Sequence, residues 1–288
     1  MDPNELDIVR RAYAKQVMAA AGIDDQRVEA AYAAVRREDF LGPGPWPVLR
    51  SRTPAPRYVM TPSADPVYLY INGVIGILPE RNLNNGEPSL HAALLASAAP
   101  QSGDHVVHIG AGVGYYTAIM AQLVGSSGAV TGIEFDASLA ARAAANVSHL
   151  SNVRIVQGDG TRLGFDPADV VYVNAGATHP APSWLDGLKE GGRLILPLTC
   201  FEARDRGPIH RRGAVFRIER QGDDLLARRI SAVVIFPCEG ARDEACEQAL
   251  SAAFENGGAE RVTRLYRRDD VPAERCWLRA PGWCLAYR

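Results

Sequence analysis

The 288-residue sequence predicts an α/β fold built on a doubly wound, mostly parallel sheet with helices on both faces. Between residues 105 and 198, short apolar runs alternate with segments of helical periodicity. Turns rich in glycine separate several of these runs from the segments that follow. The composition, 47% hydrophobic and 22% charged, is that of a globular chain long enough to bury a sizeable core.

The charge balance and the cysteine pattern exclude several other classes. The net charge of −2 provides no basic field, so no nucleic-acid partner is expected. The polar segment Met1–Arg10 is unlike a signal peptide, and no apolar run approaches the ~20 residues of a membrane span. The five cysteines form no C-x-x-C pair, so we expect neither a disulfide framework nor a metal site, and we expect a cytoplasmic location.

The first hundred residues predict a helical cap followed by an irregular wrap. Apolar residues at helical spacing predict helices over residues 5–21 and 25–38. Proline and glycine are dense from residue 41 to residue 66, which indicates an ordered loop. Residues 67–78 are expected to be extended, with Tyr68 and Tyr70 in the core. Pro88 is expected to open a helix that runs to about residue 99.

The middle of the chain alternates strand and helix, and the last third changes to antiparallel hairpins. Such alternation is typical of a parallel sheet. Strands are predicted over 105–109, 129–134, 153–156, 170–174 and 193–198, with helices over 115–123 and 137–149. Antiparallel strands are predicted over 214–220 and 225–236, with a helix over 241–254. The last residues are expected to pack against the sheet edge.

The most informative motif is the glycine turn Gly110-Ala111-Gly112-Val113-Gly114, between the first strand and its helix. Such a turn lets a ligand approach the backbone at the helix N-terminus, although a glycine turn without a ligand is the alternative. Glu134 ends the next strand, where a carboxylate can accept both hydroxyls of a ribose. Asp159, in Gly158-Asp159-Gly160, follows the third strand and can accept the exocyclic amine of an adenine.

The spacing of the glycines argues against a dinucleotide. The position of the third glycine in the dinucleotide fingerprint is Tyr115, and no lysine or arginine stands nearby for a phosphate. The site instead suits adenosine with a small zwitterionic tail, which is S-adenosylmethionine. The residues predicted to bind it are His108, Gly110, Ala111, Gly112, Gly114, Tyr115, Glu134, Phe135, Gly158, Asp159, Gly160 and Asn174.

With these motifs the sequence resembles the class I S-adenosylmethionine-dependent methyltransferases, and within them the protein-L-isoaspartate O-methyltransferases. The matching segments are Val35–Phe40 (VRREDF), Ile109–Ala118, Gly158–Gly160, Gly191–Pro197 (GGRLILP) and Phe236-Pro237. The resemblance covers roughly residues 25 to 240 and implies a Rossmann-like fold. The order of the predicted elements indicates a helical cap and substrate-side wrap over 1–100, a cofactor-binding domain over 101–240, and an extension over 241–288 packed on the same domain.

The sequence departs from this family in the loop that is expected to grip the acceptor. The family pattern T-x-S-Q-P corresponds here to Asn84-Asn85-Gly86-Glu87-Pro88, so a glycine replaces the serine and a glutamate the glutamine. The missing hydroxyl removes a hydrogen bond to the substrate, and the glutamate would repel an anionic acceptor. His108 stands where the superfamily is usually acidic.

The chemistry depends on the acceptor. An ionised carboxylate needs no base, whereas a hydroxyl or nitrogen acceptor benefits from one, most often histidine. Carboxyl methylation of a peptide or small molecule is the expected reaction, by analogy with the family. The alternatives are a hydroxyl or nitrogen acceptor, or a non-catalytic homologue that binds the cofactor. Candidate catalytic residues are His91, Asn174 and His179, and candidate substrate-binding residues are Asn84, Asn85, Gly86, Glu87 and Thr178.

Overall fold

The computed structural model describes residues 2–50, 57–81, 83–202 and 210–287. It divides into two compact units: the first is Met1–Gly103 with Ala111–Gln157, and the second is Asp104–Gly110 with Gly158–Arg288. The chain passes from the second unit to the first between Gly110 and Ala111, so the predicted glycine turn belongs to both.

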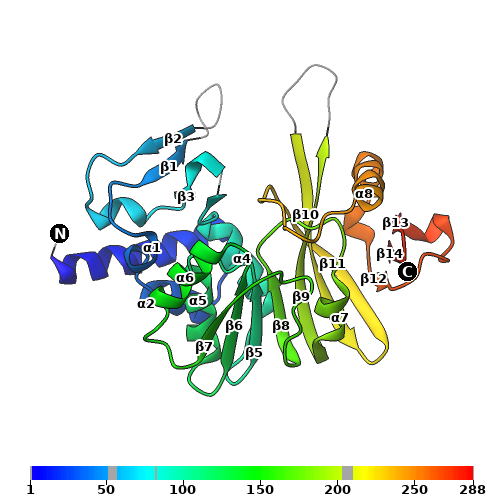
Figure 1. The fold of residues 1–288 in the computed structure, drawn as a ribbon, viewed down its shortest axis with the longest axis horizontal. Coiled ribbons are helices and arrows are strands. Elements are labelled where there is room, and N and C mark those ends of the chain that lie inside the picture. Colours follow the sequence, from blue (N-terminus) through cyan, green and yellow to red (C-terminus); the bar gives the residue numbers. More distant parts are fainter. Residues whose placement is uncertain (1, 51–56, 82, 203–209, 288) are drawn as a thin grey trace. The chain divides into compact units, whose positions relative to one another are not determined.

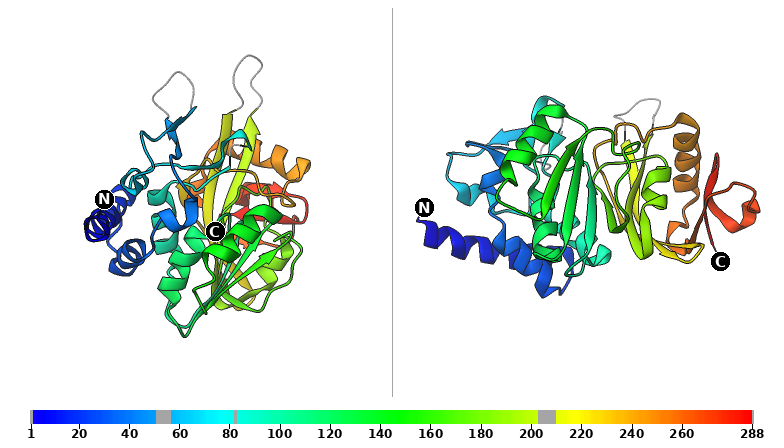
Figure 2. Two further views of the ribbon diagram at one scale, coloured as in Figure 1. Left: turned by 60° about the vertical axis from the view of Figure 1, so that its left-hand side comes forward. Right: turned by 60° about the horizontal axis from the view of Figure 1, so that its bottom comes forward.

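The first unit combines the N-terminal helices, two short hairpins and a parallel pair of strands (Figures 1 and 2). Helix α1 packs against α2 and α4, and α2 also packs against α5. Strands β6 and β7 are parallel, and α5 and α6 contact them. The helices are α1 (Pro3–Ala21), α2 (Gln26–Ala34), α3 (Glu38–Leu41), α4 (Pro88–Ala98), α5 (Tyr115–Val124) and α6 (Ala137–Asn146). The strands are β1 (Pro47–Arg50), β2 (Arg57–Met60), β3 (Gly76–Leu78), β4 (Leu83–Asn84), β6 (Ala129–Glu134) and β7 (Val153–Gln157), with 3-10 turns η1 (Pro66–Leu69) and η2 (Pro79–Arg81).

Local capping explains where the helices of this unit begin and end. Asp2 and Glu5 form a capping box at the start of α1, and Gly22 ends the helix in the left-handed conformation. The side chains of Asp25 and Asp136 accept backbone N–H bonds at the starts of α2 and α6. These caps lie within a few residues of the apolar stripes, which is why the sequence predicts most of the helices well.

Two predictions for the N-terminal region are wrong. The helix predicted over 25–38 ends at Ala34, because Val35 turns to extended backbone and the chain then carries Arg37 into the interior. The segment 67–78 is extended only from Gly76, since Pro66 and the capping carboxylate of Asp65 start a 3-10 turn. As a result Tyr70 is buried as expected, whereas Tyr68 is 36% exposed.

The second unit is one sheet in the order β13-β14-β12-β11-β10-β9-β8-β5. Strands β5, β8 and β9 are parallel, and the remaining pairs are antiparallel. Helix α8 packs against β9 and β13, and α7 packs against β9. The strands are β5 (His105–Ile109), β8 (Ala168–Val173), β9 (Leu188–Glu202), β10 (His210–Gln221), β11 (Asp224–Ala232), β12 (Arg264–Tyr266), β13 (Cys276–Ala280) and β14 (Trp283–Ala286). The helices are α7 (Pro182–Asp186) and α8 (Glu244–Asn256), with 3-10 turns η3 (Ala259–Arg261) and η4 (Ala273–Arg275).

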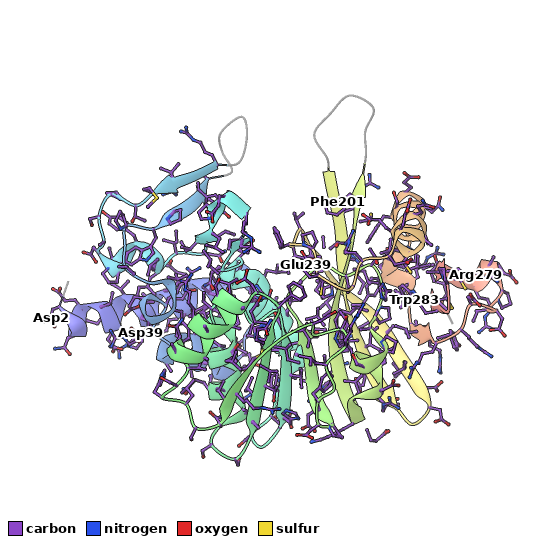
Figure 3. All side chains as sticks on the ribbon, in the orientation of Figure 1. Asp2, Asp39, Phe201, Glu239, Arg279 and Trp283 are labelled. Atoms are coloured by element: carbon purple, nitrogen blue, oxygen red, sulfur yellow. The ribbon has the colours of Figure 1, made fainter. Side chains whose placement is uncertain are left out.

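The α/β class predicted from the sequence is confirmed, and the parallel strands lie where they were expected. Consecutive residues of β5, β8 and β9 are buried, as in a sheet covered on both faces. The C-terminal residues do more than pack against the sheet edge, because β12 pairs with β11 and the hairpin β13–β14 continues the sheet. In this hairpin Trp283 is buried and Arg279 is exposed (Figure 3).

Candidate functional site

In the first unit, the glycine turn leads directly into α5 with its backbone held open. Gly112 and Gly114 have φ values of +58° and +91°, a region that other residues rarely adopt. A Cβ atom added to Gly112 would meet nothing within 4 Å. Open space therefore lies against the backbone of this turn. The positive φ, and not a lack of room for a side chain, explains why residue 112 is glycine.

Glu134 is joined to this turn by a hydrogen bond. Its Oε2 accepts the backbone N–H of Gly112 at 2.7 Å, and its Oε1 accepts that of Asp136 at 3.0 Å. The residue is 8% exposed, and burial is the largest influence on its carboxyl group, raising the pKa above the usual range. Each oxygen retains a lone pair, so the carboxylate can still accept two hydroxyl groups.

Phe135 and Asp136 follow Glu134 and differ in their surroundings. Phe135 is 52% exposed, so one face of an aromatic ring is open beside the buried acid. The carboxylate of Asp136 accepts from Ser138 and from Arg81 of η2 at 2.6 Å, and these bonds lower its pKa. The guanidinium of Arg81 is thereby paired with a carboxylate.

In the second unit, Asn174 is fixed at the carboxyl ends of β5 and β8. Its side-chain Nδ2 donates to the carbonyl of Gly110 at 3.3 Å, and its backbone N–H donates to Ile109 at 2.8 Å. Gly110 has a φ of +79°, and a Cβ there would lie 3.4 Å from the carbonyl oxygen of Asn174. The distance of 3.4 Å is ordinary contact, so the positive φ is what explains why a glycine begins the turn.

The Gly158-Asp159-Gly160 turn is organised by its own polar groups. Asp159 Oδ1 accepts the backbone N–H and the hydroxyl of Thr161 at 2.9 and 2.7 Å. The carbonyl of Gly160 accepts from the indole of Trp184 at 2.7 Å. Gly240 packs so closely that an added Cβ would lie 2.7 Å from the Asp159 carboxylate.

The predicted residues His108 and Tyr115 lie inside packed cores. His108 is fully buried on β5, with its ring edge-on to Tyr172 at 5.6 Å, and burial lowers its pKa to about 3. The imidazole is therefore neutral at pH 7. Tyr115 packs edge-on against Phe40 and Tyr32 within the first unit. Because the side chain of Tyr115 is packed in the core, only its backbone can face a ligand at the start of α5.

The expected acceptor loop is ordered by its own residues and by His91. Asn84 Oδ1 accepts the N–H of Gly86 at 2.9 Å, and the N–H of the buried Asn85 donates to Ile75. His91 is 1% exposed and stacks on Tyr116 at 3.8 Å between ring centroids. A Cβ on Gly86 would lie 2.4 Å from His91 Nε2, so the imidazole occupies the space that a side chain at position 86 would take.

Glu87, at the end of that loop, has neutral partners. It is exposed, and its Oε1 accepts weak hydrogen bonds from Asn72 Nδ2 and Ser89 Oγ, both at 3.3 Å. No ion pair joins it to another of the described residues. The negative charge expected from the sequence at this position is thus not neutralised by the described part of the chain.

Thr178 and His179 are tied to the segment before α8. The hydroxyl of Thr178 accepts the N–H of Asp243 at 2.9 Å and donates to the carbonyl of Ala241 at 3.3 Å. Thr178 is fully buried, so its observed role is to anchor this segment. His179 is half-buried, and burial lowers its pKa, which leaves the imidazole neutral at pH 7.

The structure adds Arg37, Asn72 and Arg242, which sequence analysis did not single out. One guanidinium nitrogen of Arg242 donates to the carbonyls of Gly176 and Thr199 and to the Thr199 hydroxyl, at 2.9 to 3.2 Å. Arg37 and Asn72 make comparable bonds in the first unit. Arg37 lies within the quoted VRREDF motif, but nothing in the sequence shows which distant groups these side chains reach.

No group of three or more His, Cys, Asp or Glu side chains is placed to hold a metal ion in the described part of the chain. None of the helices in residues 2–50, 57–81, 83–202 and 210–287 has the length and apolar character needed to cross a bilayer.

Comparison with known proteins identifies the family. The profile of the family described as Protein-L-isoaspartate(D-aspartate) O-methyltransferase (PCMT) matches residues 53–238. A protein-L-isoaspartate O-methyltransferase 1 of Rhodopseudomonas palustris is 30% identical over 237 residues, which cover 80% of this chain and 83% of that protein.

Solved structures agree on the fold. A protein-L-isoaspartate O-methyltransferase covers 90% of this chain and 74% of its own, with a TM-score of 0.64 and 23% identity. A putative protein-L-isoaspartate O-methyltransferase from Plasmodium falciparum, in complex with S-adenosyl-L-homocysteine, covers 80% of this chain and 98% of its own, with a TM-score of 0.60 and 18% identity. The chain is a methyltransferase and belongs to the protein-L-isoaspartate O-methyltransferase family.

Proposed function

We propose that the chain binds S-adenosylmethionine and transfers its methyl group to a carboxylate of a peptide or small molecule. The observation that carries the cofactor assignment is Glu134, a buried carboxylate hydrogen-bonded to the glycine turn at Gly112. A paired ribose diol is the ligand that such an acceptor suits. Family membership supports the same cofactor.

The residues present fit S-adenosylmethionine better than a dinucleotide. The open space at Gly112 admits a ligand against the backbone, and the exposed ring of Phe135 offers a face on which an adenine can stack. A phosphate near this turn would meet the carboxylate of Glu134, while the guanidinium of Arg81 is already paired with Asp136. For Gly110, Asn174 and Asp159, in the second unit, cofactor binding stays a prediction from the sequence.

When bound, the cofactor supplies an electrophilic methyl group, and the residues of the chain supply alignment. An ionised carboxylate acceptor needs no proton removed, so the protein has to hold the nucleophile in line and exclude water. We assign acceptor binding to the Asn84–Glu87 loop, with His91 buried behind Gly86. The uncompensated charge of Glu87 favours acceptors whose surroundings are neutral or basic.

A second candidate function is methylation of a hydroxyl or nitrogen. The observation that favours it is His179, which is half-buried and whose pKa is lowered by burial. A neutral imidazole can accept the proton that such an acceptor must lose. Asn174 remains a candidate for orienting either kind of acceptor.

The deciding experiment is transfer of labelled methyl groups from S-adenosylmethionine to an isoaspartyl peptide, with the aspartyl peptide of the same sequence as control. A methyl ester releases methanol in base, whereas methyl ethers and methylamines do not. We expect base-labile label on the isoaspartyl peptide alone. Base-stable label on other acceptors would favour the second function, and cofactor binding without transfer to any acceptor would indicate a binding protein.

The burial of Glu134 predicts a pH dependence of cofactor binding. Its carboxyl pKa is raised, so acidification protonates it above the usual range of glutamate, and a protonated carboxyl accepts the ribose diol poorly. Affinity measured by calorimetry should therefore fall as the pH is lowered through that pKa. The contribution of Glu134 to the stability of the cofactor-free protein should instead rise as the pH is lowered. A carboxyl group with a raised pKa in the folded state favours folding when it is protonated, and this contribution is lost as the pH rises through that pKa. An affinity that stays constant down to the usual pKa of glutamate would contradict this assignment.

A further inference from the structure

Arg37 is a buried cation that holds one short segment of the first unit. It is 0% exposed, and Nη1 donates to the carbonyls of Leu69 and Ile71 at 2.7 and 3.0 Å. Nη2 donates to the carbonyl of Gly73 at 3.0 Å. The three carbonyls lie within five residues of one another, so a single guanidinium fixes the backbone of residues 69–73.

Asn72 lies between two of these anchored carbonyls and caps α4 from outside the helix. Its Oδ1 accepts the N–H of Ser89 at 2.9 Å, and its Nδ2 donates to the Ser89 hydroxyl at 2.9 Å. Ser89 is the second residue of α4, and the N-cap residue Glu87 makes no capping bond with its own side chain. The amide of Asn72 therefore satisfies an N–H that helices normally leave to their N-cap.

The same amide reaches the end of the expected acceptor loop. Asn72 Nδ2 is 3.3 Å from Glu87 Oε1, and Glu87 is followed at once by the start of α4. One turn into that helix, His91 packs its Nε2 against Gly86. A displacement of the α4 N-terminus would thus be transmitted to both ends of the Gly86–Glu87 peptide.

We propose that Asn72, fixed by Arg37, is a positioning residue that sets the conformation of the Asn84–Glu87 loop for the acceptor. The proposal rests on the proposed function, in which this loop binds the acceptor. Asn72 is itself exposed, so its substitution opens no cavity and leaves the core in place. Its effect is expected on acceptor binding and on the order of the loop, with cofactor binding unchanged.

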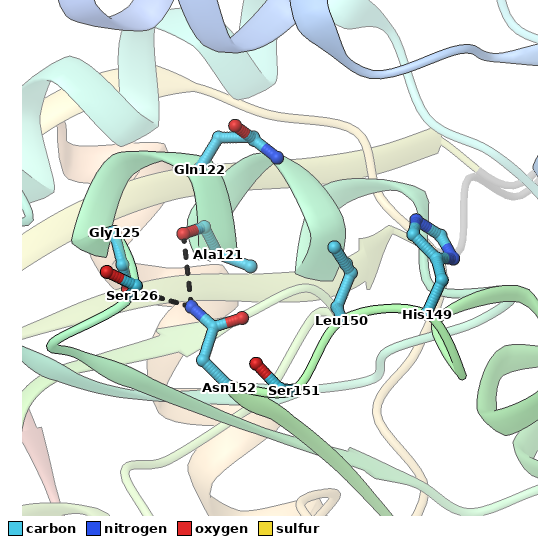
Figure 4. Close-up of a pocket in the computed structure, with 8 residues that line it drawn as sticks. All are labelled: Ala121, Gln122, Gly125, Ser126, His149, Leu150, Ser151 and Asn152. Carbon is cyan, nitrogen blue, oxygen red and sulfur yellow. Dashed lines mark hydrogen bonds between the residues drawn. The ribbon is translucent and has the colours of Figure 1, made fainter.

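The first test is hydrogen exchange of the whole protein with Asn72→Ala. Because two hydrogen bonds to Ser89 are lost, amides of residues 84–91 should exchange about tenfold faster. The matched control is Asn152→Ala. Asn152 Nδ2 donates to the carbonyls of Ala121 and Gly125 at 3.4 and 2.8 Å, at the far end of α5 (Figure 4). The control should leave residues 84–91 unchanged, and unchanged exchange in Asn72→Ala would overturn the proposal.

The second test uses kinetics on the isoaspartyl peptide. Asn72→Ala should raise KM for the peptide about tenfold, with the cofactor dissociation constant unchanged. Asn72→Asp should be worse, since a second carboxylate would face Glu87. If the wild type methylates the peptide and the Asn72 variants have the same KM as the wild type, the positioning role is overturned. No transfer by the wild type counts against the proposed function, and the exchange measurement then still decides the inference.

Discussion

Glu134→Ala should weaken S-adenosylmethionine binding by about 10- to 100-fold, the cost of losing charge-assisted hydrogen bonds to the ribose. The substitution also frees the N–H groups of Gly112 and Asp136, which the carboxylate now holds at 2.7 and 3.0 Å. The turn loses its fixed conformation as well as the ligand's acceptor. Calorimetric titration with S-adenosylmethionine measures the effect directly.

The stability of the same variant separates binding from folding. Burial raises the Glu134 pKa, so the charged side chain opposes folding at neutral pH. Relief of this charge offsets part of the cost of the two lost hydrogen bonds, and the free energy of unfolding should fall only slightly. Glu190→Ala is a suitable control, because Glu190 also accepts a glycine N–H, that of Gly222 at 2.9 Å, on an exposed turn. The control should retain full affinity. Equal affinity in Glu134→Ala and the wild type would remove Glu134 from the cofactor site.

Elements with strong local signals could be predicted closely from the sequence. Strands β5 and β6 have the predicted limits: β5 lies between Asp104 and Gly110, and β6 begins after Gly128 and ends with Glu134. The link between Glu134 and the glycine turn follows from the same pattern, since both stand at carboxyl ends of strands. In such segments a few neighbouring residues determine the structure.

Features that depend on distant contacts could not be predicted. The bonds from Arg37 join residues more than thirty positions apart, and they accompany the break after Ala34 that interrupts a periodic helical pattern. The three-residue strand β12 is too short to produce a periodicity. Likewise, the sequence shows that Gly86 lacks a hydroxyl but gives no indication that His91 fills the space. Tertiary packing determines each of these features.

Gly86→Ser should lower the free energy of unfolding by roughly 3 kcal/mol, although it restores the residue of the family pattern. Two costs combine: a non-glycine residue at a φ of +68°, and a Cβ 2.4 Å from His91 Nε2. His91→Ala removes the second cost and leaves the first. Denaturant unfolding of the wild type, both single variants and the double variant measures the two separately.

The double-mutant cycle decides whether serine and histidine compete for one space. If they do, the cost of serine should be lower by about 1–2 kcal/mol when His91 is alanine. Additive costs would mean that the imidazole moves aside freely and that only backbone strain opposes serine. Competition between a serine at position 86 and the His91 imidazole also predicts which variant has altered substrate use. In Gly86→Ser alone the Cβ of the new side chain collides with the ring. Methylation of isoaspartyl peptide should therefore increase only in the double variant, in which the serine has room beside the loop.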